Sequence, residues 1–375
     1  DGYSLVLTEA GAIWSFGMND RGQLGIGYTG KDQFQSWDLE VVDYQTHYTN
    51  YAAYLAAAAN YEEEYGVSLP DYVPAPEYVG DMPTPTLVYQ GLSASTSEKL
   101  TNIVEVAAGG AHVLAIRSDG TLFAWGDNTY GQLGTGYDRD ATDVLFNYHV
   151  PVTVIPGKAE EGQVQCAMDI AAGDNHSIVL LADGSVLTWG RNGYGQLGDR
   201  ARADQTYNPV LREEMVDGVL DWYADPFPTP TDEMTVLPRQ ITVGKDGERV
   251  SGVAAGGDNS GVIIGEKYNV LLWGTNENGQ LGRDDTATPE KTLAYSYTPT
   301  YLNKGDSESV AVDGVSAPYF EGALTVALGG THGAAVKDTY YVWSWGANDN
   351  GQLGNGTHMN AEEPVLTGDR DSKIL

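Results

Sequence analysis

Histidines and acidic residues are the side chains of this sequence best suited to metal or proton chemistry. Three histidines, His112, His176 and His332, stand at the same place in a recurring Gly-x-x-His string. Because each belongs to a separate copy of that string, the three would be spread around the molecule and would not converge on one ion. We therefore interpret them as buried, hydrogen-bonded structural histidines, with metal binding as the alternative.

Acidic pairs are the second possible source of metal ligands. They are Asp138 and Asp140, Asp284 and Asp285, and Asp369 and Asp371. None of these pairs has the ligand spacing of a dedicated calcium loop, so the sequence leaves calcium binding by these segments open. Cys166 is the only cysteine, which excludes a disulfide framework and a cysteine-based metal site. We expect this cysteine to be a small core residue.

Motifs for catalysis or nucleotide binding are missing from the sequence. No Gly-x-Ser-x-Gly nucleophile motif occurs, and no glycine-rich string continues into Gly-Lys-Ser/Thr. The sequence also shows no paired acid and base. We expect a protein that is not an enzyme and that needs no cofactor.

The elements that position all of these residues come from one stretch that occurs five times, at residues 11–25, 120–134, 184–198, 269–282 and 340–354. Its first half is typical of a β-strand ending in Trp-Gly, and its second half has the Asn and Gly residues of a turn. We interpret the tryptophans, including Trp14 in the first copy, as core residues. The repeat motif residues are Trp125, Gly126 and Gln132; Trp189, Gly190 and Gln196; Trp273, Gly274 and Gln280; and Trp345, Gly346 and Gln352.

A second repeated string of small residues precedes four of these copies, at 106–116, 170–180, 253–264 and 326–336. Small side chains predict a strand that lies close to neighbouring backbone. Residues 1–7 fit the later part of this string, and Ser372 to Leu375 fit its beginning. We therefore expect the sequence to be a fragment that begins inside a repeat.

The two strings together resemble the repeat of the regulator of chromosome condensation family. Four copies are close to Trp-Gly-x-Asn-x-x-Gly-Gln-Leu-Gly, whereas the first has Phe16-Gly17, and Asn259-Ser260 replaces the usual histidine in the fourth repeat. The resemblance implies an all-β fold, a β-propeller of four-stranded antiparallel blades, usually seven in number. We expect residues 1–375 to form a single propeller domain with five repeats, an incomplete portion of such a ring. The family includes a nucleotide exchange factor for the Ran GTPase, an inhibitor of β-lactamase and domains of bacterial surface proteins.

Each blade is predicted to contain the small-residue strand, a hairpin strand, the Trp strand and an edge strand led by proline. The long insertions, at residues 28–82, 137–148, 199–235 and 283–297, all fall between the last two of these strands. Equivalent connections of equivalent blades emerge on one face, and loops that grow on one face of a scaffold commonly bind partners.

Aromatic residues in two insertions are the candidate partner-binding residues. In the first, a predicted helix over 51–65 carries Tyr51, Tyr54 and Tyr61 on one face, and Trp37 precedes it. In the second, a Pro-rich and aromatic-rich loop carries Trp222, Tyr223 and Phe227. Such residues suit an interface. The alternatives are that the tyrosines pack the helix onto the propeller and that the second loop has a small core of its own.

Charge and composition narrow the class of partner. The formal net charge is −32, which argues against nucleic acid and against anionic membranes, and no apolar run is long enough for membrane insertion. The 24 tyrosines and the single cysteine are typical of an exported bacterial protein. We expect an extracellular interaction or adhesion module for a protein or a glycan. The alternatives are a regulator, such as an enzyme inhibitor or an exchange factor for a small GTPase, and a cytoplasmic location. The sequence does not specify the oligomeric state.

Overall fold

A computed structural model describes residues 2–26, 82–90, 98–136, 148–156, 166–198, 212–216, 219–223, 234–244, 248–283, 295–304 and 319–368. The described residues are all β-strand, turn or irregular structure, without a helix. The helix predicted over 51–65 lies outside them.

Four of the sheets are four-stranded, antiparallel and formed by strands that are consecutive except where one hairpin intervenes. The second blade contains β6 (Ile103–Ala108), β7 (His112–Arg117), β8 (Thr121–Gly126) and β9 (Tyr148–Pro156). The third contains β10 (Ala167–Ala172), β11 (His176–Leu181), β12 (Val186–Arg191) and β15 (Met234–Ile241). The fourth contains β16 (Val250–Gly256), β17 (Asn259–Ile264), β18 (Asn269–Thr275) and β19 (Tyr295–Tyr301). The fifth contains β20 (Ala323–Leu328), β21 (His332–Lys337), β22 (Val342–Gly346) and β23 (Ala361–Leu366).

The first blade is three-stranded within the described residues. It contains β1 (Tyr3–Leu7), β2 (Ile13–Gly17) and β3 (Met82–Leu87), which correspond to the second, third and fourth strands of the other blades. Two short hairpins complete the fold, β4 (Tyr89–Gln90) with β5 (Glu98–Lys99), and β13 (Arg212–Val216) with β14 (Val219–Tyr223).

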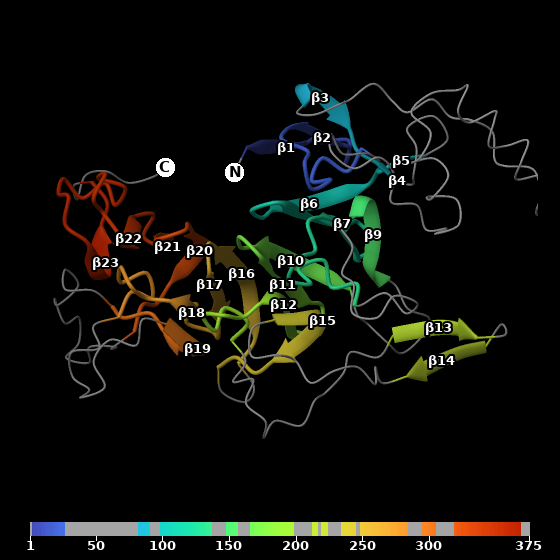
Figure 1. Cartoon of the computed structure of the whole chain (residues 1–375). Helices are drawn as coiled ribbons and strands as arrows, with labels where there is room; N and C mark the ends of the chain where they lie inside the picture. The colour runs from blue at the N-terminus through green and yellow to red at the C-terminus, as the bar shows by residue number, and fades with distance from the viewer. Residues whose placement is uncertain are drawn as a thin grey trace, which may run out of the picture.

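The five blades follow an arc, with β1–β3 at one end and β20–β23 at the other (Figure 1). The first strands of the blades, β6, β10, β16 and β20, line the concave side of the arc, and β9, β15, β19 and β23 lie on its outer side (Figure 1). This radial order of antiparallel blades is the β-propeller that the repeats predict.

The apolar core lies between blades. Each of the four buried clusters joins residues of two consecutive blades: Leu114 and Trp125 belong to clusters on opposite flanks of the second blade. Alternate residues of a strand point to opposite faces of its sheet, so a blade with apolar residues on both faces packs against both neighbours. The fold therefore requires neighbouring blades, as in other repeat architectures.

Several boundaries and burial predictions need correction. The edge strands are predicted to be led by proline, but they begin before it: β15 starts at Met234, whereas its proline is Pro238. Trp14 is half-buried, because Phe16 occupies the position that Trp125 holds in the second blade. Cys166 is also half-buried, against Gly120, and does not belong to a core cluster. Residues 199–235 contain the β13–β14 hairpin and are therefore not a loop throughout.

Candidate functional site

The Gly-Gln-Leu-Gly turn is held by the side chains of its own motif. In the second blade, Gln132 Oε1 accepts the main-chain N–H of Tyr130 at 2.8 Å. Asn128 Oδ1 accepts the N–H of Leu133 at 3.0 Å. The same pair of bonds recurs in every blade, with Gln23, Gln196, Gln280 and Gln352 as the glutamines. Because these amides satisfy buried backbone donors, the turn is a rigid platform on which the following connection is mounted.

Each turn is also tied to the next blade through a tryptophan. Trp189 Nε1 donates to the main-chain oxygen of Gln132 at 2.8 Å. Trp125, Trp273 and Trp345 donate in the same way to Gln23, Gln196 and Gln280. All four indoles are fully buried, so each hydrogen bond fixes a turn against a core residue of the neighbouring blade.

His112 and His176 belong to the same junctions. His112 Nε2 lies 3.0 Å from Ser177 Oγ, and that hydroxyl donates to the carbonyl of Gln132 at 2.8 Å. Since the Ser177 proton is used on Gln132, the imidazole must donate, which fixes the neutral tautomer with Nε2 protonated. His176 and Ser260 repeat this arrangement at the next junction, with Gln196 as the acceptor. His112 and His176 are therefore buried and hydrogen-bonded, as the sequence predicts, whereas His332 is only half-buried.

Burial lowers the pKa of His112 to about 4 and that of His176 to about 3. In the fourth repeat the histidine is replaced by Asn259, and the next blade has Gly333 where the third and fourth blades have Ser177 and Ser260. At this junction both the histidine and the serine of the hydrogen bond are therefore absent. Asn259 instead donates to Thr275 O within its own blade at 2.7 Å.

The turns and the insertions share one end of the blades, which we name the turn face. In the second blade, His112 pairs with Gly126 and Gly126 with Tyr148, so the third strand ends and the fourth begins at this end. Neighbouring blades meet there through bonds from Gly110 N to Asp174 O and from Asp174 N to Gly257 O. The opposite end, the hairpin face, carries the turns between second and third strands, such as Asp119-Gly120.

A cationic and aromatic cluster lies on the turn face. The Arg191 guanidinium lies 5.4 Å from the ring centroid of Tyr130 and 5.2 Å from that of Tyr194. Arg191 also pairs with Asp258 at 3.7 Å. Burial raises the pKa of Asp258, and Arg191 opposes that shift. The cluster joins the second, third and fourth blades, and its side chains are partly exposed.

The sequence analysis did not predict this cluster, because its members stand at motif positions whose residue type varies from one copy to the next. A signal existed: Tyr130 and Tyr194 occupy the same place in successive copies, and Arg191 follows a Trp-Gly pair. Of the predicted partner-binding residues, Trp222 and Tyr223 lie on β14, within the third-to-fourth-strand connection of the third blade. The positions of Trp37, Tyr51, Tyr54, Tyr61 and Phe227 lie outside the described residues.

Within the described ranges, no group of three or more His, Cys, Asp or Glu residues is placed to hold a metal ion. The acidic pairs at 138–140, 284–285 and 369–371 fall outside those ranges. No described helix is long and apolar enough to cross a membrane.

Sequence comparisons identify the repeat. The regulator of chromosome condensation (RCC1) repeat matches residues 119–180, 183–220 and 341–373, and a second form of it matches 103–132 and 169–196. The human E3 ubiquitin-protein ligase HERC2 is 26% identical over 409 aligned residues, covering 98% of this chain. The chain spans only 7% of the length of HERC2. The Arabidopsis thaliana ultraviolet-B receptor UVR8 is 26% identical over 95% of this chain and 68% of its own length.

Solved structures show the same fold at low identity. Human WBSCR16 superimposes with a TM-score of 0.58 and 18% identity, covering 98% of this chain and 65% of its own. Yeast RCC1 (Prp20), in its complex with Kap60, gives a TM-score of 0.55 and 18% identity, covering 99% and 74%. The chain therefore contains regulator of chromosome condensation repeats, at residues 103–220 and 341–373, and its blades have the β-propeller fold.

Proposed function

We propose that this chain is a non-catalytic scaffold that binds a partner protein through its turn face. The observation that carries the proposal is topological: in each of the five blades, the connection from the third to the fourth strand leaves from this face. In the first blade this connection runs from Gly17 to Met82, and in the third it runs from Arg191 to Met234 and includes a hairpin. Variable segments mounted together on a rigid platform form a binding surface.

The Arg191 cluster supplies a suitable contact chemistry. Arginine and tyrosine are enriched among the residues that dominate interface energies, because both bury large area with few flexible bonds. Tyr130 and Tyr194 hold the guanidinium before any partner arrives, which lowers the entropy cost of binding. The chain as a whole has a formal charge of −32, so we expect a partner surface of positive potential.

Solved relatives of the same fold favour a protein partner over a glycan. Yeast RCC1 (Prp20) has been solved bound to Kap60, and the Saccharomyces cerevisiae Prp20p structure is associated with binding to Gsp1p and histones. Those statements concern Prp20, and they support a protein-binding role here as an analogy of fold. The ligase activity of HERC2 is not part of the proposal, since this chain spans 7% of that protein.

We also propose an extracellular bacterial location, on composition alone. The single cysteine, the 24 tyrosines and the strongly acidic balance motivate this proposal. Fractionation of source cells with an antibody against the chain tests it. Antigen confined to the cytoplasm would reject it and leave the scaffold proposal intact.

Two matched arginines allow a direct test of the turn face. Arg191 and Arg117 have side-chain exposures of 30% and 29%, each pairs with an aspartate, and each stacks on an aromatic ring. Arg191 lies on the turn face and Arg117 leads into a turn of the hairpin face. Purified chain is screened by biolayer interferometry against arrays of proteins and of glycans, and each ligand found is measured with both arginine-to-alanine variants.

The proposal expects a protein ligand whose affinity falls at least about tenfold, roughly 1.4 kcal/mol, in Arg191→Ala and is unchanged in Arg117→Ala. Equal affinities of the two variants for the ligand would show that it does not bind at the Arg191 cluster of the turn face. A ligand found only on the glycan array would reject the protein partner. If the chain, added in an equimolar amount, changes β-lactamase turnover or nucleotide release from a small GTPase, the protein is a regulator and the scaffold proposal is rejected.

A further inference from the structure

The first strand of each four-stranded blade is interrupted at its second residue. The pairing of β6 with β7 skips Val104, and the pairings of the other three first strands skip the equivalent residue. A bulge leaves its extra residue unpaired and re-aims the residues beside it. The unpaired residues are Val104, Met168, Ser251 and Leu324, and all four are exposed on the inner wall of the arc.

The residue after the bulge faces the next blade at two junctions. Asp169 Oδ2 accepts the main-chain N–H of Val253 at 2.8 Å. Glu105, the equivalent residue of the second blade, is placed beside Asp169 and the N–H of Ile170, which act on its pKa in opposite directions. Ile170 and Val253 are equivalent residues of successive blades.

These N–H groups are available because antiparallel pairing alternates. Bonded pairs alternate with pairs whose N–H and C=O groups point away from the partner strand. In the fifth blade Gly329 N donates to His332 O, so these two residues form a hydrogen-bonded pair. Every second residue before Gly329 on β20 is bonded in the same way, and these residues are Ala327 and Thr325. The N–H of Val326 therefore points away from β21 and toward β16, like those of Ile170 and Val253.

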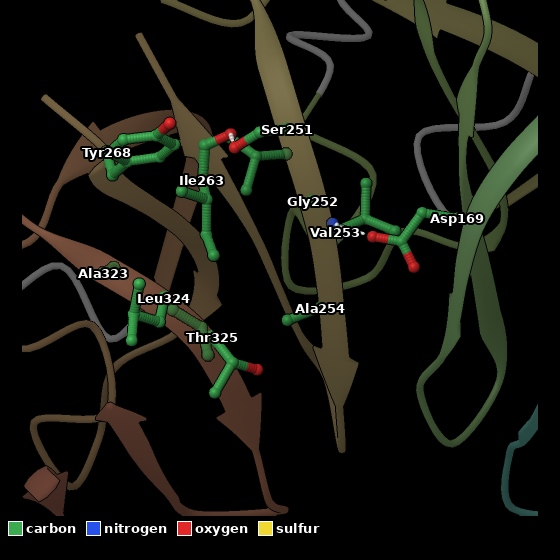
Figure 2. A pocket seen from close by; sticks show the side chains of 12 residues that line it. Asp169, Ser251, Gly252, Val253, Ala254, Ile263, Tyr268, Ala323, Leu324 and Thr325 are labelled. Carbon is green, nitrogen blue, oxygen red and sulfur yellow. Dashed lines mark hydrogen bonds between the residues drawn. The ribbon is translucent and has the colours of Figure 1, made fainter. Parts of the chain in front are cut away.

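Gly252 stands at the place from which a side chain would reach Val326. It is the counterpart of Glu105 and Asp169, and it has no side chain to offer. A pocket of about 390 Å³ occupies this junction, between Asp169, Ile263, Leu324 and Val326. Figure 2 shows Asp169 on one side of Gly252 and the β20 residues Leu324 and Thr325 on the other.

The pocket could accept a side chain without strain. A Cβ atom built on Gly252 would lie 3.4 Å from Asp169 Oδ2 and 3.7 Å from Ile263 Cδ1, which are contact distances. The niche thus has a donor in Val326, an acceptor in Asp169, and apolar walls. A group that fills it must accept one hydrogen bond and donate another.

Glu105 shows which chemistry suits such a niche. Burial, together with the hydrogen bond and charge of Asp169, raises the pKa of Glu105 to about 8, so this side chain is a neutral acid at pH 7. A neutral carboxyl group and a primary carboxamide have the same shape, with one oxygen acceptor and one donor. An anion entering beside Asp169, on a protein of charge −32, would meet repulsion that a carboxamide avoids.

We propose that the pocket at Gly252 binds a primary carboxamide, the Gln or Asn side chain of a bound polypeptide. Its oxygen accepts the N–H of Val326, its NH2 group donates to Asp169, and its methylene groups lie against Ile263 and Leu324. The site lies toward the hairpin-face end of the inner wall, near Tyr268, so it is separate from the turn face and does not depend on the proposed function.

NMR of the whole chain labelled with ¹⁵N-valine tests the site, with the Val326 signal assigned by its loss in Val326→Ile. The probes are N-acetylglutamine methylamide, propionamide, propionate, and butanone, which has the carbonyl but lacks the NH2 group. At pH 7 both carboxamides should shift the Val326 signal saturably, at least tenfold more tightly than propionate or butanone. No saturable shift with either amide, or tighter binding of propionate, would overturn the proposal. Binding of propionamide without the capped glutamine would overturn the polypeptide source.

Substitution of Gly252 provides the matched control. Gly252→Asn places a carboxamide of the protein itself in the pocket and should abolish the shift of the Val326 signal that the probes cause. Gly330→Asn adds the same side chain on the turn face, away from the pocket, at a residue with nothing within 4 Å, and should leave the shift unchanged. Gly252→Asn should also raise the thermal midpoint above that of Gly252→Asp at pH 7. Equal probe binding in Gly252→Asn, or a higher midpoint for the aspartate, would contradict the carboxamide assignment.

Discussion

Trp125 donates its indole N–H to the main-chain oxygen of Gln23, 3.0 Å away in the preceding blade. This bond ties the core of one blade to the turn that mounts the insertion of another. Its three equivalents repeat the arrangement along the arc. The Trp and Gln residues of the repeat motif therefore join neighbouring blades to each other, in addition to forming the blades.

Removing the indole should be costly. We expect Trp125→Ala to lower the free energy of unfolding by about 3–5 kcal/mol, because a fully buried aromatic ring is lost. Trp125→Phe keeps much of the ring but leaves the Gln23 carbonyl without this donor, which should cost about 1–3 kcal/mol. Trp14→Ala, at a half-buried position, is the control and should cost less. Denaturant unfolding measures all three, and equal costs would contradict the junction role.

Glycine at the end of the third strand should not tolerate a side chain. Gly190 has φ +105°, and a Cβ atom would lie 2.5 Å from the Asn175 oxygen. Gly184 has φ +90° but nothing within 4 Å of a Cβ atom, so it isolates the backbone cost. Gly184→Ala should lose about 1–2 kcal/mol of stability. Gly190→Ala should lose roughly 1–3 kcal/mol more, through the added clash. Similar thermal midpoints for both variants would show that the strand end can relax.

The buried histidines should make stability fall in mild acid. Their folded-state pKa values, about 4 for His112 and about 3 for His176, lie below the ordinary value of 6.5. The unfolded chain therefore binds more protons in this range, so the contribution is complete above pH 6.5 and is lost as the pH falls toward 4. Each histidine adds a slope of up to about 1.4 kcal/mol per pH unit.

Glu105 makes stability rise as the pH falls through part of this range, because its folded-state pKa is raised. The histidine effect is therefore best measured as the difference in stability between the wild type and a variant without the two histidines. The double variant His112→Gln/His176→Gln should lose less stability than the wild type between pH 6.5 and 4, by urea unfolding. Parallel pH profiles would contradict the neutral, buried state of the histidines.

Glu105 itself should destabilise the protein in alkali. Its folded-state pKa of about 8 lies above the ordinary 4.5, so its contribution is complete below pH 4.5 and is lost as the pH rises through 8. Gln has the shape and hydrogen-bonding groups of the neutral acid. Glu105→Gln should therefore match the wild type near pH 5 and exceed its thermal midpoint at pH 9. A midpoint difference that does not change with pH would contradict the raised pKa of Glu105.

The blade order follows from sequence because it depends on local patterns. The small residues before His112 and the Trp-Gly pair at Trp125 specify two strands of each blade, and the repeat supplies the rest. The bulge at Ser251 and the niche at Gly252 were not predicted, since both depend on how first strands of different blades meet. Aligning Glu105, Asp169 and Gly252 across repeats would have given a signal, but only once the bulged register was known.

Boundaries and single side chains were harder to predict than strand order. The edge strand β15 extends three residues before Leu237, because pairing with β12 continues past a register shift at Thr188 and Gly190. The Asp217-Gly218 turn signal of the β13–β14 hairpin was masked by the Pro-rich and aromatic-rich composition around it. The Arg191 cluster joins three blades, so the sequence of one repeat does not show which of its side chains meet.

Site-specific photo-crosslinking tests the binding face most directly. Benzoylphenylalanine replaces Tyr194 on the turn face or Tyr340, which is 56% exposed in a turn of the hairpin face. Both chains are irradiated in extracts and on intact cells of the source organism. We predict a discrete protein adduct from position 194 that Arg191→Ala weakens, and none of the same mass from position 340. The same adduct from both positions, or an adduct from position 340 alone, would contradict a scaffold that binds its partner through the turn face.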